Sequence, residues 1–222
     1  MPMTWDKTGE KYFETGVDHA ILFEMTDEGT YTNGVVWNGI TGVEENPEGG
    51  DPNDFWADNI KYGSISGAEK YKATIKAYTY PDEFMKYDGS AQIAPGVYAG
   101  LQGRPAFGFA YRTLKGNDIK GTELGYIWHI VYGCKASPSS KSHDTVNDSP
   151  DMVEFSWEID STPAAFSGEA AKKYKPTSTF TVDSTKFATD ADKQKLEAFE
   201  SQLEGGTMPL PDEMLTLFPT TP

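Results

Sequence analysis

Apolar and polar residues alternate along several stretches of the chain. The clearest stretches are residues 69–80 and 153–160, in which every second side chain is apolar. A half-buried strand has this period because successive side chains point to opposite faces of a sheet. Residues 107–114 and 124–132 flank a glycine-containing segment, which predicts a β-hairpin. Further strands are expected over residues 17–25, 32–44 and 177–182, so the predicted fold class is mainly β.

Two segments carry helix signals instead. Residues 81–88 begin with a proline and two acids and end before a glycine, which predicts a short helix. Residues 189–204 place Leu196, Phe199 and Leu203 on one side of a charged helix with Thr189 as its N-cap. The predicted architecture is therefore a β-sandwich or barrel with a short flanking helix, a C-terminal helix and extended arms.

Three segments carry apolar side chains without a predicted place in the core. They are an N-terminal arm over residues 1–16, a Pro- and Gly-rich loop over 45–58, and a C-terminal arm over 207–222. The β domain then spans residues 17–206 and contains the loop as an insertion. Exposed apolar clusters commonly mark protein contacts. The residues expected at subunit interfaces are Trp5, Tyr12, Phe13, Phe55, Trp56, Leu215 and Phe218.

Composition narrows the range of functions. The chain has 19 basic and 34 acidic residues, and its net charge of −15 disfavours tight binding to nucleic acid or anionic lipid. No apolar run has the ~20 residues of a membrane-spanning helix, and no N-terminal run resembles a signal peptide. The one cysteine, Cys134, fits a reducing compartment. We expect a soluble protein that is made in the cytoplasm and does not contact a membrane.

The sequence offers little catalytic chemistry. His19, His129 and His143 lack metal-ligand spacing, and Cys134 should lie on the opposite face of a continuous strand from His129. Residues 51–54 resemble only the start of a calcium loop. No phosphate-binding glycine loop occurs in the chain, so we expect neither an enzyme nor a cofactor.

Short segments spread over residues 5–185 carry a resemblance to a known family. They are Trp5–Lys7, Gly9–Lys11, Glu14–Asp18, Val36–Gly39, Ala57–Tyr62, Ala77–Phe84, Ala136–Pro138, Thr145–Pro150 and Phe155–Glu158. These segments resemble the major tail tube proteins of long-tailed bacteriophages. The resemblance implies a tail-tube-type β-sandwich, with six copies in a ring and rings stacked into a helical tube. It also implies assembly in the host cytoplasm, location in the virion, and a tape measure protein, tail terminator and distal tail or baseplate proteins as partners. It brings no catalytic residue.

A tube that conducts DNA without binding it should have a net negative lumen. Glu154, Glu158 and Asp160 form the polar face of one predicted strand and are the expected lumen-lining residues. The lysine face of residues 69–80 is then expected outside the tube, or paired with carboxylates on neighbouring strands.

One alternative remains open, a non-catalytic β-sandwich that binds carbohydrate or protein. In such a module Trp37, Trp56 and Tyr98 would be available to stack on sugars.

Overall fold

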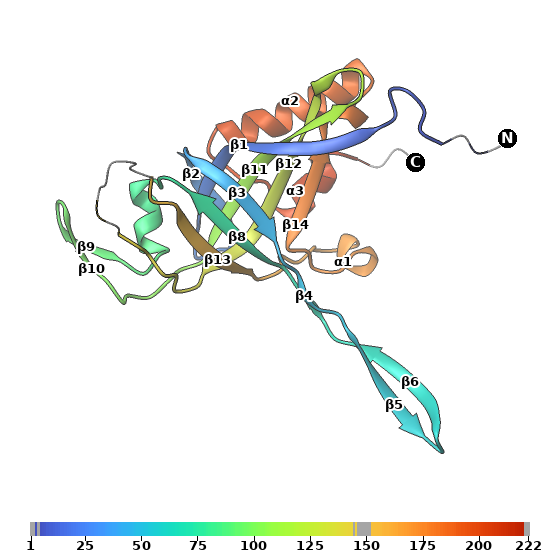
Figure 1. Ribbon diagram of the computed structural model, residues 1–222, viewed down its shortest axis with the longest axis horizontal. Helices are drawn as coiled ribbons and strands as arrows, with labels where there is room; N and C mark the ends of the chain where they lie inside the picture. The colour runs from blue at the N-terminus through green and yellow to red at the C-terminus, as the bar shows by residue number, and fades with distance from the viewer. Residues whose placement is uncertain (1–2, 4, 144, 146–151, 220–222) are drawn as a thin grey trace.

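An eight-stranded antiparallel sheet forms the body of the protein (Figure 1). The structure, a computed structural model, describes residue 3, residues 5–143, residue 145 and residues 152–219. Seven strands of the sheet follow the order β2-β1-β11-β12-β13-β8-β3, and β14 pairs with β12 beside β13. The bounds are β1 Tyr12–Met25, β2 Tyr31–Trp37, β3 Ile40–Glu45, β8 Lys72–Ala77, β11 Phe107–Asn117, β12 Gly121–Ala136, β13 Phe155–Ser161 and β14 Thr179–Asp183.

The remaining elements surround this sheet. Three two-stranded ladders pair β4 with β7, β5 with β6, and β9 with β10. Their bounds are β4 Glu48–Gly49, β5 Pro52–Ala57, β6 Ile60–Ser66, β7 Glu69–Lys70, β9 Ala91–Ala94 and β10 Val97–Ala99. The helices are η1 Asp82–Lys86 and η2 Ser184–Lys186, both 3₁₀, with α1 Ala170–Lys173, α2 Asp190–Glu204 and α3 Pro211–Leu217.

The mainly β fold class and the strongly periodic elements are confirmed. In β8 and β13 the apolar positions Ile75, Trp157 and Ile159 are buried and the alternate positions are polar. The predicted hairpin is β11–β12, with both strands longer than expected. Helix α2 begins where predicted, because the Thr189 hydroxyl accepts a hydrogen bond from the backbone N–H of Asp192.

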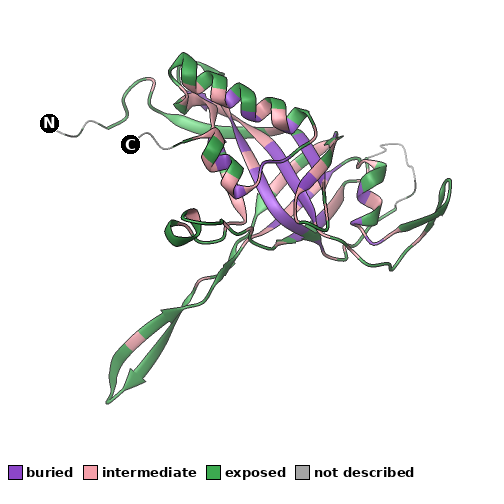
Figure 2. Cartoon of the chain, turned by 180° about the vertical axis from the view of Figure 1, so that it is seen from behind, coloured by how far each residue is buried: buried purple, intermediate pink, exposed green. Residues whose placement is uncertain are grey.

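Two apolar clusters hold the sheet together, and Figure 2 shows the buried positions concentrated in its crossing strands. In the first, the rings of Trp37, Phe84 and Trp157 meet between the β8–β13 part of the sheet and β11. In the second, Phe199 and Leu203 of α2 cover the other face of β12. Because both faces of β12 are buried, most of its central residues are apolar and do not alternate with polar ones.

Two predicted boundaries near the N-terminus are wrong. Strand β1 starts at Tyr12, inside the expected arm, and pairs with β11 from Tyr12↔Asn117 onward. A shift in its pairing near Gly16 interrupts the alternation, which hid the strand in the sequence. The single strand expected over residues 32–44 is divided into β2 and β3, because Gly39 takes a φ of 78° between them.

The loop expected over residues 45–58 is also wrong. Nine of its fourteen residues lie in strands: Glu45 ends β3, two residues form β4, and six form β5, which pairs with β6 as a β-ribbon. Asp58 and Asn59 have φ of 51° and 62°, and two successive positive φ values make the tight turn that joins such strands. Prolines in this segment predicted a loop, but an edge strand tolerates proline because its outer N–H groups need no partner in the sheet.

The C-terminal segment is not a projecting arm. Met208 bridges to Tyr31 of β2 and is 1% exposed, and Met214 of α3 is 3% exposed in the second apolar cluster. Pro211 occupies the first turn of α3, where a missing N–H costs nothing. The prolines taken as signs of an arm therefore start a helix. Residues 220–222 of the expected C-terminal arm and residues 1, 2 and 4 of the expected N-terminal arm lie outside the described residues. So do residues 144 and 146–151, which include most of the segment Thr145–Pro150 that carries part of the resemblance.

A bulge in β12 corrects the expected placement of Cys134. Gly133 has a φ of 54°, and the four residues of β12 from Val131 to Cys134 face the three residues of β11 from Phe107 to Phe109. The bulge returns Cys134 to the cluster that contains Val131, on the face where His129 stacks against Tyr111. The odd spacing of His129 and Cys134 therefore does not separate them onto opposite faces.

Candidate assembly surface

The β5–β6 ribbon projects from the body as its most exposed element (Figure 1). Every residue of β5 is exposed, and in β6 every residue except the half-buried Gly63 is exposed (Figure 2). Apolar side chains are nevertheless frequent on it. Their exposed fractions are 46% for Phe55, 67% for Trp56, 63% for Ile60, 79% for Tyr62 and 65% for Ile65.

The two faces of the ribbon differ in polarity. On one face, Asp54 lies 2.7 Å from Lys61 Nζ and accepts a hydrogen bond of 2.7 Å from Ser64. Because alternate residues of a strand point to opposite faces, Phe55 and Ala57 lie on the other face. Phe55 pairs with Gly63 and Ala57 pairs with Ile60, so Ile60 lies on that face too. Asn53 lies on the same face by alternation, and it pairs with Ile65. We call the side of Phe55, Ile60 and Ile65 the apolar face.

Phe55 and Trp56 therefore point in opposite directions. The shift in pairing between them adds a residue to β6 and leaves β5 regular, so Trp56 shares the polar face with Lys61. Sequence reasoning treated the two rings as one patch and missed Ile60 and Ile65. The two-residue turn at Asp58-Asn59 was the available signal, because it places the strand after it in register with β5.

A cluster of polar groups fixes the root of the ribbon. Glu45, the last residue of β3, accepts hydrogen bonds from Tyr111 Oη at 2.7 Å and Tyr71 Oη at 3.1 Å. The backbone N–H of Asn46 donates to the carbonyl of Lys72 at 2.7 Å. Burial raises the pKa of both tyrosines, so the hydroxyls stay protonated and can donate. We call Glu45, Tyr71 and Tyr111 the root clamp.

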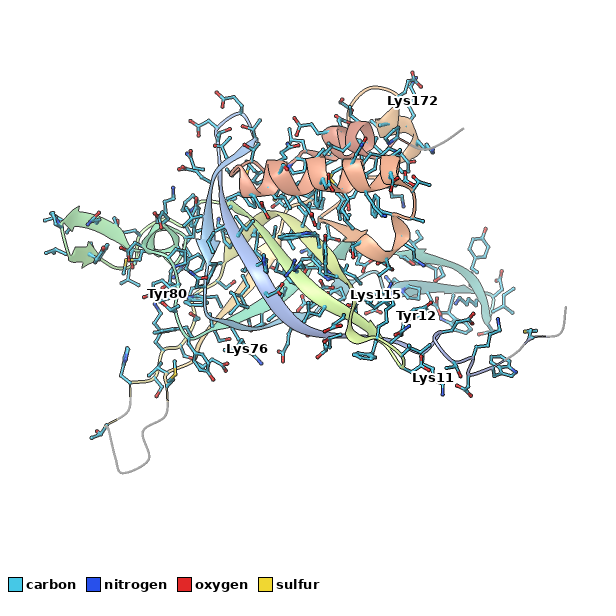
Figure 3. The ribbon with its side chains drawn as sticks, turned by 90° about the horizontal axis from the view of Figure 1, so that it is seen from above. Lys11, Tyr12, Lys76, Tyr80, Lys115 and Lys172 are labelled. Carbon is cyan, nitrogen blue, oxygen red and sulfur yellow. The ribbon has the colours of Figure 1, made fainter. Side chains whose placement is uncertain are left out.

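The other predicted interface residues are distributed over two regions. Trp5 is 79% exposed and Tyr12 60%, and the Tyr12 ring lies 5.6 Å from Lys115 Nζ (Figure 3). Phe13 is 44% exposed and covers Gly116 of β11. Leu215 and Phe218 are half-buried on the body of their own subunit. The ribbon, the N-terminal residues and α3 thus form separate patches within one subunit.

The β9–β10 hairpin is a further exposed apolar element that sequence reasoning missed. In the hairpin Ile93 is 72% exposed and Val97 52%, and Leu101, which follows β10, is 100% exposed. Pro95-Gly96 between the strands was the available turn signal.

The expected lumen-lining residues lie beside lysines. Strands β8 and β13 are neighbours, and Ile75 and Trp157 form an in-register pair that points into the core. The polar side chains of both strands therefore share the outer face. Lys72 lies 2.8 Å from Glu48 and 3.7 Å from Asp160, and Lys76 lies 2.8 Å from Glu44. Of the two arrangements expected for the lysines, the structure shows the one paired with carboxylates.

Side chains that could bind a metal or act as a nucleophile are scattered or buried in the described part of the chain. No cluster of three or more His, Cys, Asp or Glu residues there could hold a metal ion. Complete burial raises the pKa of the Cys134 thiol, which makes it a poor nucleophile. A polar hollow of about 210 Å³ between Glu48, Lys72 and Glu158 is part of the paired surface described above. None of the helices described is long and apolar enough to cross a membrane.

Comparison with known proteins places the chain in no family. No protein-family model matches it, and no curated protein does. Among solved structures, a chain of the baseplate of the anti-feeding prophage, determined by cryo-EM with six-fold symmetry, matches with a TM-score of 0.37 and 6% identity. The match covers 81% of this chain and 97% of that one. A similarity of this size assigns neither fold nor function.

Proposed function

We propose that the chain is the structural subunit of a bacteriophage tail tube. Copies would form hexameric rings that stack into a tube around the tape measure protein and later conduct DNA. The sequence segments that resemble major tail tube proteins support this assignment, as does the mainly β fold. The subunit would act without catalysis or a cofactor, and its location would be the virion.

The exposed β5–β6 ribbon carries the proposal. A two-stranded ribbon alone in water is at best marginally stable, and this one has no apolar cluster of its own. It also exposes Phe55, Trp56 and Ile60, and buried aromatic side chains contribute strongly to interfaces. A neighbouring subunit would cover these side chains and stabilise the ribbon.

Charge supports a tube through which DNA passes without binding. The chain has a net charge of −15, which repels a phosphate backbone. Glu154, Glu158 and Asp160 stay our proposed lumen-lining residues, since the face that they share with Lys72 and Lys76 also carries Glu44. The face thus carries these four acids and two lysines, so acids still outnumber bases on it. Tail terminator and baseplate proteins would contact the ends of the tube.

The carbohydrate-binding alternative has less support. Trp37 is 2% exposed and donates a hydrogen bond from its indole to the Thr79 carbonyl, so it cannot stack on a sugar. Trp56 and Tyr98 lie on the two hairpins that project from opposite sides of the body in Figure 1. These rings do not form a common platform.

Electron microscopy of the purified protein tests the proposal. We expect wild-type protein to form rings or tubes at high concentration, alone or with tape measure and terminator proteins. Phe55→Ala combined with Trp56→Ala should keep the monomer folded and prevent assembly, because interface aromatics commonly contribute ~2 kcal/mol or more each. Val36→Ala is the control, since Val36 is 62% exposed on β2. Wild-type protein that stays monomeric under all these conditions would contradict the proposal.

A further inference from the structure

An apolar groove lies between β14, η2 and α3. It has a volume of about 540 Å³, and Phe187, Leu215 and Phe218 contribute its apolar lining. The Phe187 and Phe218 rings lie 5.3 Å apart at one side of the groove. Lys186 of η2 and Lys195 of α2 also line it. A groove of this size and composition can accept several apolar side chains.

One edge of β14 borders this groove and has no partner strand. In the described residues β14 forms a ladder only with β12, through the pairs from Ile127↔Asp183 to Val131↔Thr179. Its other edge therefore presents backbone N–H and C=O groups that a further strand can bind. An exposed edge beside an apolar groove is the arrangement used in β-strand addition, where the backbone provides affinity and side chains fill pockets.

The β5–β6 ribbon has the complementary features. Both of its outer edges are unpaired within the described part of the chain, and its apolar face carries Phe55, Ile60 and Ile65. The N-terminal segment before β1 has Met1, Met3 and Trp5 as its large apolar residues, but none of its described residues forms a strand that could add to an edge. The ribbon points away from the body in Figure 1, and so away from the groove of its own subunit.

We propose that the ribbon of one copy adds to the free edge of β14 in another copy, with its apolar face against Phe187, Leu215 and Phe218. This inference rests on the proposed function only in taking a second copy as the partner. The contact joins two different patches of the same chain, so each subunit can give one ribbon and receive another. Contacts of this heterologous type generate closed rings or open filaments, as a tube requires.

Charge favours the same pairing. Among the ion pairs of the described residues, Asp51 and Asp58 of the ribbon have no cationic partner, and Lys186 at the groove has no acidic one. Asp183 and Asp192, the acids of the groove, are already paired with Lys115 and Lys195. A ribbon with unpaired carboxylates would thus meet a groove with an unpaired ammonium group. We expect Lys186→Glu to raise the concentration needed for assembly about tenfold or less, and more at low than at high salt.

Cysteine cross-linking tests the contact. The native Cys134 is completely buried, so introduced cysteines report their own contacts. Protein with both Ile60→Cys and Leu215→Cys should give a ladder of covalent oligomers on mild oxidation. A mixture of the two single variants should give dimers and no larger product, because each chain then has one reactive patch. Ile93→Cys with Leu215→Cys is the matched control, since Ile93 is as exposed as Ile60 and lies on the other hairpin.

Each outcome separates this inference from the proposed function. Tubes without cross-links would overturn the groove assignment and leave the tube function intact. Cross-linked dimers of the Ile60→Cys variant alone would show that ribbons meet each other, and cross-links only within one chain would show that the ribbon folds back. Either result overturns the inference. A ladder from protein that forms no rings or tubes would support the contact and contradict the tube function.

Discussion

The β5–β6 ribbon and the C-terminal segment have similar compositions and opposite environments. Each contains proline and large apolar residues and follows a pair of glycines, Gly49-Gly50 before the ribbon and Gly205-Gly206 before the C-terminal segment. The C-terminal segment buries Met208 and Met214 against its own sheet, whereas the ribbon exposes Phe55, Trp56 and Ile60. Composition therefore does not tell whether such a segment docks within its own subunit or on another.

The difference arises from what lies within reach of each segment. The C-terminal segment follows α2, and its Met208 bridges to Tyr31 on the unpaired edge of β2. The Gly206 carbonyl accepts a hydrogen bond from the Gly34 N–H, so the chain is already aligned with that edge. The ribbon instead pairs its two strands with each other and leaves the body after the root clamp. Intrasubunit burial needs an uncovered apolar surface nearby, and the C-terminal segment finds one.

The largest effect is expected from truncating Met214, one of the two buried methionines of the C-terminal segment. Met214→Ala should lower the free energy of unfolding by about 2–5 kcal/mol, because it removes contacts and leaves a cavity in the second cluster. Urea denaturation of the monomer measures this change. The matched control is Met25→Ala, since Met25 is 37% exposed on β1 and its truncation should change stability much less. Equal effects of the two variants would contradict the distinction between a buried segment and an exposed surface.

A smaller effect is expected at the root clamp. Tyr111→Phe removes the hydrogen bond to Glu45 and should lower the free energy of unfolding by about 0.5–1.5 kcal/mol. The ribbon should also sample more directions, which spin labels on its tip and on the body measure as a broader distance distribution. Tyr62→Phe is the control because Tyr62 is 79% exposed on the ribbon. An unchanged distance distribution in Tyr111→Phe would show that other contacts fix the ribbon.

The smallest expected effect is on the pH dependence of stability, through His129 next to the root clamp. His129 stacks on Tyr111 with ring centroids 4.6 Å apart, and burial lowers its pKa despite the nearby carboxylates of Glu45 and Glu14. His129 therefore binds a proton more tightly in the unfolded state than in the folded state. The stability that neutral His129 contributes is complete above pH ~6.5, its pKa in the unfolded state, and is lost as the pH falls toward its lower pKa in the folded state. Denaturation between pH 8 and pH 5 should therefore show a weaker pH dependence in His129→Gln. An identical dependence in both proteins would contradict this prediction.

Local periodicity determined the elements that the sequence predicted correctly. The alternation in β8 and β13, the i, i+3, i+7 spacing of Leu196, Phe199 and Leu203, and the N-cap Thr189 depend on neighbours a few residues away. The exposure of Phe55 and Trp56 was also predictable, since two large aromatics stood among prolines, glycines and acids. These features follow from the chain itself because side-chain direction repeats with the backbone.

Only the tertiary structure decided how these elements combine. It determined where β1 starts, the bulge at Gly133 and the opposite directions of Phe55 and Trp56. It also determined the burial of Met214. Each of these features depends on a pairing or contact with another segment of the chain. It also placed Lys72 and Asp160 on one face, because β8 and β13 became neighbours although some eighty residues separate them. Strand pairing and apolar docking are set by which surfaces meet after folding, and a one-residue shift in register reverses every side chain on a strand.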